Sequence, residues 1–234
     1  MSPPMKTFDV LIVGGGIVGS AAAHYLKKHG FTGTVAIIER DTSWQTGCTA
    51  RSVGGIRQQF STPENIALSK FGLKLVRNLR QEFGPEADIG FKEQGYLICA
   101  SEQGLPILEE NHAVQISQGA DNVLLRGEEL SARFPWLVAD GIAAGCFGLS
   151  GEGWVDPYLF AGLFRKAALA QGVDLIVGEV TGVSREANRI PGVTLASGEA
   201  IGCGTLVNAA GAGGGKLARP AGGGPPGGPP QRYM

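Results

Sequence analysis

The stretch TFDVLIVGGGIVG, residues 7–19, decides the fold of this chain. Its first half is an apolar run of the kind that forms a buried parallel strand. Its second half fits the pattern G-x-G-x-x-G, and a helical pattern of apolar residues follows to His29. A second apolar run, residues 34–38 (TVAII), ends on Glu39, twenty residues after Gly19. Strand, glycine turn, helix, strand and acid in this order predict a βαβ unit that binds a dinucleotide.

Each glycine of the turn has a mechanical role. Gly14 permits the tight turn, Gly16 lets the backbone approach a pyrophosphate, and Gly19 lets helix and strand pack closely. The first helical residues, Ile17 and Val18, offer N–H groups and the positive end of the helix dipole to the phosphates.

Glu39 ends the second strand, where its carboxylate is expected to accept hydrogen bonds from the adenosine ribose hydroxyls. A lone G-x-G-x-x-G is weak evidence in a chain with 38 glycines. The whole arrangement nevertheless favours dinucleotide binding over a merely tight βα turn.

Composition narrows the class of protein. The 234 residues, 43% of them hydrophobic, suffice for one large domain or two small ones with a real core. A net charge of −1 gives no electrostatic case for nucleic acid, and no apolar run approaches the ~18–20 residues of a membrane span. The first strand begins so close to the N-terminus that we expect no targeting peptide and a cytoplasmic protein. The four cysteines and three histidines lack metal or catalytic spacing, which predicts reduced thiols and no metal site.

The remainder of the chain alternates helical and strand-like patterns. Residues 41–61 form a long loop rich in Gly, Ser and Thr, which predicts a functional segment. Thr62, Pro63 and Glu64 predict the start of one helix that runs to Gly84. Its apolar face would take Ile66, Phe71, Leu75, Leu79 and Phe83.

Further elements are expected along the rest of the chain. Helices are predicted at residues 101–117, 127–134 and 156–170, and strands at residues 95–100, 123–125, 143–147, 174–177, 180–184, 193–196 and 205–207. Residues 211–230 contain nine glycines and five prolines, which predicts coil.

Four stretches together resemble the D-amino-acid oxidase-like family of FAD-dependent amine oxidoreductases, which includes sarcosine and dimethylglycine oxidases or dehydrogenases and glycine oxidase. They are the glycine turn with Glu39 and Arg40, the loop TGCTARSVGGIRQQF (residues 46–60), GWVDP (153–157) and VNAAG (207–211). The loop is the most particular and looks most like the sarcosine and dimethylglycine branch. The resemblance runs over residues 7–218, about the first three-fifths of a typical family member.

The resemblance implies an α/β fold in two parts. Residues 1–87 and 151–218 would form a Rossmann-like FAD-binding domain with a mainly parallel sheet, and residues 88–150 would form part of an α+β substrate domain. We interpret residues 219–234 as a Gly/Pro-rich, truncated end. For the chain as given we therefore expect little retained FAD and no turnover, because the elements that enclose the flavin come later in the family.

The resemblance also implies a set of FAD contacts besides the glycine turn, Glu39 and Arg40. These positions are Thr49, Ala50, Ser52, Gly54, Gly55, Val180, Ala209, Ala210 and Gly211. The two loop glycines would let the backbone approach the isoalloxazine ring. The simple alternative is that Val180 and Ala209 are core strand residues. Because Ala50 and Arg51 stand where some covalently linked relatives carry histidine, non-covalent FAD is favoured.

Arg57 is the candidate substrate-binding residue. In amine oxidases of this kind, an arginine in this region can hold the substrate carboxylate by a bidentate pair. The alternative is a solvated or structural arginine. The implied function is oxidation of a small amine or N-methyl amino acid by hydride transfer to FAD, with oxygen or a carrier as electron acceptor. A nicotinamide-dependent dehydrogenase and a catalytically silent truncated piece are the alternatives.

Overall fold

The computed structural model describes residues 5–219 and Gly222. The chain divides into two compact units, Met1–Ser52 with Pro157–Met234, and Val53–Asp156. The first unit is therefore built from two separate stretches of sequence. Residues 53–87 and 151–156, which we assigned to the FAD-binding part, belong to the second unit in this division.

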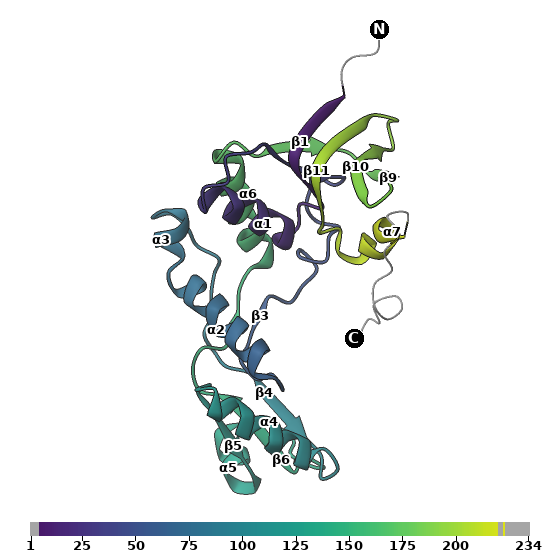
Figure 1. The fold of residues 1–234 in the computed structure, drawn as a ribbon. Coiled ribbons are helices and arrows are strands. Elements are labelled where there is room, and N and C mark those ends of the chain that lie inside the picture. Colours follow the sequence, from purple (N-terminus) through teal and green to yellow (C-terminus); the bar gives the residue numbers. More distant parts are fainter. Residues whose placement is uncertain (1–4, 220–221, 223–234) are drawn as a thin grey trace. The chain divides into compact units, whose positions relative to one another are not determined.

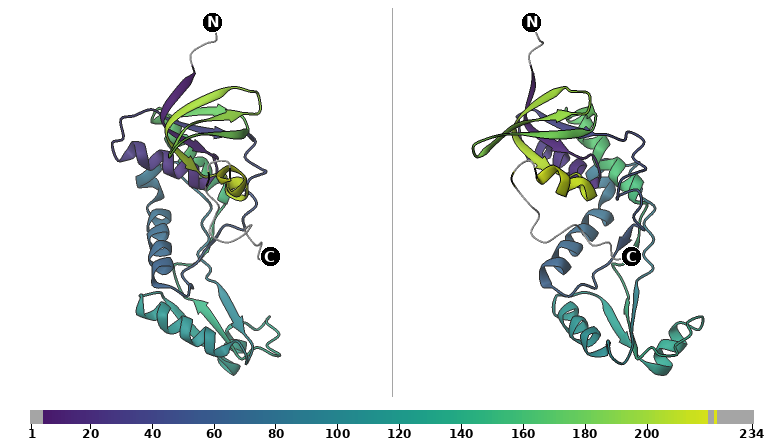
Figure 2. Two further views of the ribbon diagram at one scale, coloured as in Figure 1. Left: turned by 45° about the vertical axis from the view of Figure 1, so that its right-hand side comes forward. Right: turned by 90° about the vertical axis from the view of Figure 1, so that its right-hand side faces the viewer.

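A six-stranded sheet forms the centre of the first unit and can be followed from three sides in Figures 1 and 2. In spatial order its strands are β8 (Asp174–Val177), β2 (Val35–Glu39), β1 (Lys6–Val13), β11 (Ala200–Asn208), β10 (Arg189–Leu195) and β9 (Val180–Glu186). The first four are parallel to one another, and β10 and β9 add an antiparallel edge. Val10 pairs with Thr205 and Val13 with Asn208. The predicted α/β fold with a mainly parallel sheet is confirmed.

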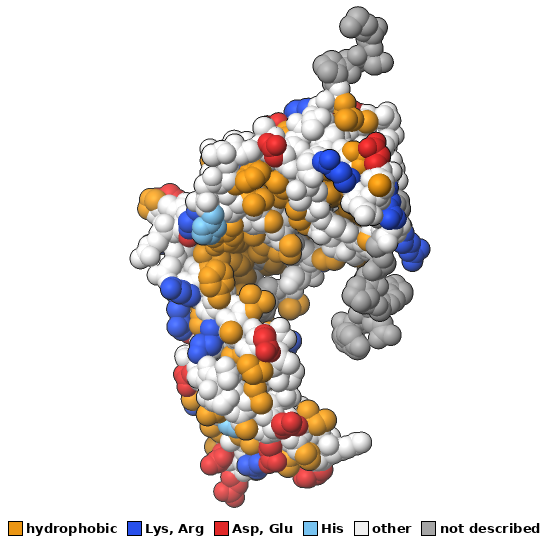
Figure 3. Space-filling view, viewed as in Figure 1, with side chains coloured by type: hydrophobic (Ala, Val, Ile, Leu, Met, Phe, Trp, Pro, Cys, Tyr) orange, Lys and Arg blue, Asp and Glu red, His pale blue; other side chains and the backbone are white. Residues whose placement is uncertain are grey.

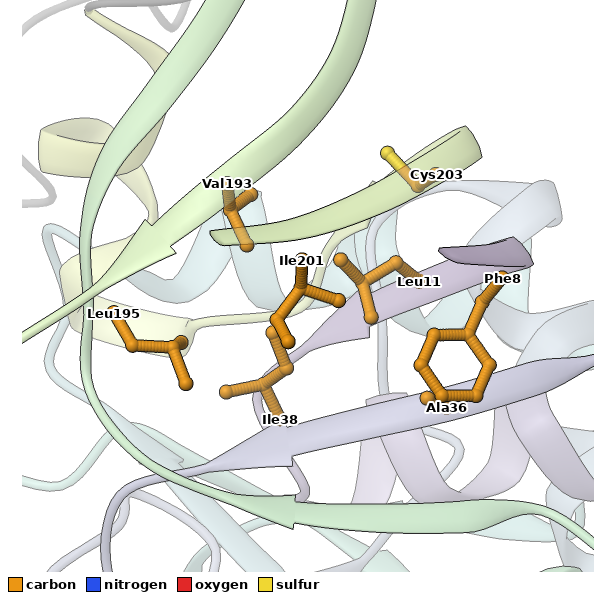
Figure 4. Packing of buried hydrophobic residues seen from close by; sticks show 8 residues of the cluster. All are labelled: Phe8, Leu11, Ala36, Ile38, Val193, Leu195, Ile201 and Cys203. Atoms are coloured by element: carbon orange, nitrogen blue, oxygen red, sulfur yellow. The ribbon is translucent and has the colours of Figure 1, made fainter. Parts of the chain in front are cut away.

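Strand β1 is buried on both faces, which explains its continuous apolar sequence. Leu11 and Ile12 are both fully buried, and side-chain alternation along the strand sends them to opposite faces. Leu11 packs in a layer with Ile38, Val193 and Ile201 from neighbouring strands (Figure 4).

Two helices cover the other face of this sheet. They are α1 (Ile17–Lys28) and α6 (Pro157–Ala170). Ile12 packs there with Ala23 of α1 and Ala168 of α6. Apolar side chains also reach the surface over these two helices (Figure 3), and Leu169 is 39% exposed.

The second unit contains a three-stranded antiparallel sheet in the order β4 (Leu97–Ala100), β6 (Ala144–Gly148) and β5 (Asn122–Leu125). Helix α4 (Leu105–Ser117) packs on it through Leu108, which contacts the layer of Ala144 and Cys146. The unit also holds α2 (Pro63–Arg77), α3 (Leu79–Phe83), α5 (Gly127–Arg133), and a ribbon of β3 (Gly55–Ile56) with β7 (Gly153–Trp154). No helix in the described part of the chain is long and apolar enough to cross a membrane.

The helix predicted from Thr62 to Gly84 is divided at Asn78 into α2 and α3. Thr62 precedes α2 but makes no side-chain capping hydrogen bond. The predicted apolar face was also wrong at Phe71, which is 62% exposed. The buried residues Ile66, Leu73 and Val76 follow the seven- and three-residue spacing of one helix face, whereas Phe71 lies five residues after Ile66 on another face.

Two further expectations were wrong. Helix α4 begins at Leu105, because residues 101–104 form a turn in which the N–H of Gly104 donates to the carbonyl of Ser101. The coil expected after residue 210 starts instead with a 3₁₀ turn, Gly211–Gly213, and the short helix α7 (Gly214–Ala218). Leu217 is buried and anchors this helix. Apart from Arg219 and Gly222, the rest of the Gly/Pro-rich end lies outside the described residues.

Candidate functional site

A cavity of about 690 Å³ lies in the first unit at the carboxyl ends of β1 and β2. It is bounded by the glycine turn, the loop after β2, the start of β9 and the residues that follow β11. Cofactor and ligand pockets are typically roughly 300–1,000 Å³ in volume. In open α/β sheets, ligands bind at this edge of the sheet. The position and size of the cavity are those of a cofactor site.

Most residues that the sequence marks as dinucleotide contacts line this cavity. They are Gly14, Gly16, Ile17, Val18, Glu39, Arg40, Thr49, Ala50, Val180, Ala209, Ala210 and Gly211. Gly19 and Ser52 belong to the same unit but do not line it. Gly54, Gly55 and Arg57 lie in the second unit.

The glycine turn leaves no room for side chains. Gly14 has φ +106°, and a Cβ there would lie 2.3 Å from the carbonyl oxygen of Ala209, at the end of β11. A Cβ on Gly19 would lie 1.9 Å from the carbonyl oxygen of Gly14. The backbone of the turn therefore lies against the end of the neighbouring strand β11 at Gly14 and against its own helix α1 at Gly19. Neither position has room for a side chain, so both are glycine.

The start of helix α1 has the properties of an anion site. Gly16 is the N-cap residue and supplies no side-chain cap, and the first turn of the helix contains no acidic residue. The N–H of Ile17 donates to Oγ1 of Thr49, at 3.2 Å. Among the described residues the Thr49 hydroxyl donates no hydrogen bond, so its proton is available to a ligand oxygen, while the helix start supplies a partial positive charge.

Glu39 is fixed by two backbone groups. Its Oε2 accepts the N–H of Gly15 at 2.8 Å, and its Oε1 accepts the N–H of Asp41 at 2.9 Å. An ionised carboxylate offers about four acceptor positions, so about two stay available for the hydroxyls of a ribose.

Glu39→Ala should weaken FAD binding by about 1–3 kcal/mol, the scale of hydrogen bonds to a charged group. Glu179→Ala is the matched control, because Glu179 lines the same cavity but, within the described part of the chain, its side chain makes only an exposed ion pair with Arg40. FAD affinity, measured by calorimetric titration of the apoprotein, should change little in this control. NADP should not compete with FAD, because its 2′-phosphate would meet the carboxylate of Glu39. Equal FAD affinity in the Glu39 variant and the wild type would remove the proposed role.

Two cavity residues, Trp44 and Arg165, were not predicted. A Cβ on Gly15 would lie 2.5 Å from the Trp44 ring, and the Arg165 guanidinium lies 3.9 Å from the centroid of that ring. The loop that carries Trp44 is organised by Asp41, and hydrogen bonds from Ser43 and Thr46 lower the pKa of the Asp41 carboxyl. Burial lowers the pKa of Arg165. Because the loop and α6 are distant in sequence, no local pattern could connect Trp44 with Arg165.

In the second unit, the ribbon of β3 and β7 joins two of the four stretches that carried the family resemblance. Gly55 pairs with Trp154 and Ile56 with Gly153. A Cβ on Gly55 would lie 2.2 Å from the Tyr96 hydroxyl oxygen, so this glycine makes room for a side chain of its own unit.

Arg57 directly follows this ribbon and is exposed. Its guanidinium lies 5.2 Å from the centroid of the Phe60 ring, and its carbonyl accepts the hydroxyl of Ser69. Among the described residues, no carboxylate pairs with this guanidinium.

The profile of the FAD dependent oxidoreductase (DAO) family matches residues 9–233. The chain belongs to this family. FAD is the cofactor of the family, which favours FAD over the nicotinamide alternative, and the cavity, the open helix start and Glu39 fit the ADP part of FAD.

Individual relatives agree with this assignment. The chain is 39% identical to FAD-dependent oxidoreductase domain-containing protein 1 of Xenopus laevis, over 94% of this chain and 49% of the relative. It is 31% identical to sarcosine oxidase subunit beta of Rhizobium meliloti, over 94% of this chain and 53% of that protein. The crystal structure of L-proline dehydrogenase from P. horikoshii matches with a TM-score of 0.79 and 31% identity, over 94% of this chain and 57% of that chain. The chain therefore spans about half the length of the curated relatives it matches.

Proposed function

We propose that this chain forms part of an FAD-dependent enzyme that oxidises a small amine or N-methyl amino acid. Sarcosine and proline, the compounds in the names of two relatives, are both secondary amines that carry a carboxylate. Such a substrate calls for a cation that can hold the carboxylate while the carbon next to nitrogen reacts.

The observation that carries this proposal is the state of Arg57. Its guanidinium is exposed and rests on Phe60, with no carboxylate partner among the described residues. An arginine that packs on an aromatic ring but is not ion-paired has all the N–H donors of its guanidinium available to a ligand. We assign Arg57 the role of binding the substrate carboxylate.

The residues that line the cavity in the first unit are assigned to binding FAD. The glycine turn and the start of α1 hold the FAD pyrophosphate, and Glu39 holds the adenosine ribose, with FAD bound non-covalently. FAD, when bound, would supply the acceptor for the hydride equivalent that leaves the substrate carbon. The substrate nitrogen releases one proton, and water hydrolyses the imine product. An amine that binds neutral needs no protein base, which agrees with the lack of a catalytic His or Asp pattern in the sequence.

Arg57→Ala in the FAD-loaded enzyme should raise KM for sarcosine about 10- to 100-fold, as expected for loss of hydrogen bonds to a charged group. KM for a neutral N-methyl amine of similar size should change little. Arg57→Lys, which keeps the charge but not the fork, should lie between these results. Arg80→Ala, at an exposed position on α3 in the same unit, is the control. Equal losses for both substrates would show a structural arginine.

A further inference from the structure

A buried carboxylate lies beside the segment that carries Arg57. Glu152 is only 1% exposed. Its Oε1 accepts the N–H of Gln58 at 2.6 Å and the N–H of Gln59 at 3.1 Å, and its Oε2 accepts the Gln59 side-chain amide at 2.8 Å. No cation pairs with it among the described residues. Burial of a carboxylate is costly unless hydrogen bonds replace water, and here three N–H groups do so.

The same contacts fix the two residues that follow Arg57. The side-chain amide of Gln58 donates to the carbonyl of Gly151 at 3.4 Å, and that of Gln59 also donates to the carbonyl of Tyr96 at 2.9 Å. With the Arg57 carbonyl bound by Ser69, the backbone is tied immediately at and after Arg57. The direction in which the arginine leaves the chain is therefore set by this network.

Glycines around Glu152 make the space that the network needs. A Cβ on Gly148 would lie 2.0 Å from Oε2 of Glu152, and a Cβ on Gly151 would lie 2.3 Å from the side-chain nitrogen of Gln58. The sequence thus leaves room for these polar side chains at two separate points.

The thiol of Cys146, next to Glu152, is unreactive, which argues against a second reactive centre here. Burial, together with the charge of Glu152, raises the pKa of the Cys146 thiol to about 12. This thiol therefore stays protonated and is no nucleophile. Both oxygens of Glu152 are engaged by N–H donors of its own unit, which suits this side chain to hold the structure of the segment.

We infer that Glu152 is a positioning residue that holds Arg57 for the substrate carboxylate, and so sets the preference for amines that carry one. This inference rests on the proposed function of Arg57. The preference for a carboxylate would then also depend on a buried residue that lies 95 positions after Arg57 in the sequence.

Glu152→Gln tests the inference with little change in shape. The new amide can still accept the two backbone N–H groups, but its NH₂ group would face the NH₂ group of Gln59. A flip of the Gln59 amide would relieve this contact only by turning its oxygen toward the carbonyl of Tyr96. We therefore expect the segment to shift, and KM for sarcosine to rise about 10-fold, because small displacements of a binding group have large kinetic effects. KM for the neutral N-methyl amine should stay within about twofold of wild type.

Glu93→Gln is the matched control. Glu93 lies in the same unit and accepts the N–H of Gly151 at 2.6 Å and a hydrogen bond from Arg77, but has no bond to residues 57–59. It should leave the ratio of the two KM values unchanged. A second variant, Gln59→Met, removes the amide that binds Glu152 and Tyr96, and should reproduce the effect of Glu152→Gln if the latter does not fold.

The double variant with Arg57→Ala separates positioning from general stability. If Glu152 acts through Arg57, Glu152→Gln should add no further increase in KM for sarcosine once Arg57 is alanine. An unchanged KM ratio in folded Glu152→Gln or Gln59→Met, or a full additional loss in the double variant, would overturn the inference. Failure of Arg57→Ala alone to distinguish the two substrates would instead overturn the proposed function.

Discussion

In the FAD-loaded, family-length enzyme, Gly19→Ala is expected to destabilise the first unit by about 3 kcal/mol, the upper end of the usual range for overpacking, and to abolish retention of FAD, because the site cannot yield. The added Cβ would lie 1.9 Å from the carbonyl oxygen of Gly14 and 3.2 Å from Cγ2 of Ile12. Gly14 is held in place because its N–H donates to the carbonyl of Ile38 at 2.9 Å. Ile12 is fully buried and cannot move aside. Relief would require the helix to move away from β1, which would displace the N-terminus of α1 from the cavity.

Gly72→Ala is the control for helix propensity. Gly72 lies inside α2, and a Cβ there would meet nothing within 4 Å. Alanine at such a position should stabilise the helix by about 0.5–1 kcal/mol. The measurement is urea unfolding of both variants of the family-length enzyme, followed by the amount of flavin that each retains after gel filtration. A Gly19 variant that unfolds at the wild-type urea concentration with its FAD bound would contradict the packing argument.

The first unit could be predicted well from sequence because its signals are local and ordered. The apolar runs at residues 7–13 and 34–38 each indicate a strand, and the glycine turn between them indicates the start of a helix. The pairing of β1 with β11 joins residues almost 200 positions apart, yet both strands read as buried runs that end in small residues. The sequence therefore indicated that both strands belong to one buried, mainly parallel sheet, whereas their direct pairing is seen only in the structure.

The network around Glu152 could not be predicted for the opposite reason. Glu152 stands between two glycines in a stretch that reads as a loop, and its partners Gln58 and Gln59 lie more than 90 residues earlier. A glutamate in a loop is normally solvated, and only the fold shows that this one is 1% exposed. Trp44 and Arg165 are a similar case, since a cation–aromatic contact leaves no pattern in sequence. Short helices such as α7 are missed because one buried residue, Leu217, outweighs the glycine-rich composition around it.

Leu11→Ala should lower the unfolding free energy of the first unit by about 2–5 kcal/mol, the range for a buried leucine that leaves a cavity. Leu11 is 0% exposed, and its strand is hydrogen-bonded to β2 on one side and β11 on the other. Its layer, seen in Figure 4, therefore has little freedom to collapse into the space. Leu169→Ala on α6, where the side chain is 39% exposed, is the matched control and should cost much less.

Added FAD distinguishes this variant from Gly19→Ala. A ligand that binds only the folded state raises stability by an amount that depends on its concentration and dissociation constant. Because Leu11 lies in the core and does not line the cavity, the increment from saturating FAD should be the same in Leu11→Ala as in wild type. In Gly19→Ala the increment should disappear, since the turn itself is displaced. Urea unfolding with and without FAD measures both quantities. A reduced increment in Leu11→Ala would show that the packing layer beneath the turn also sets the geometry of the cofactor site.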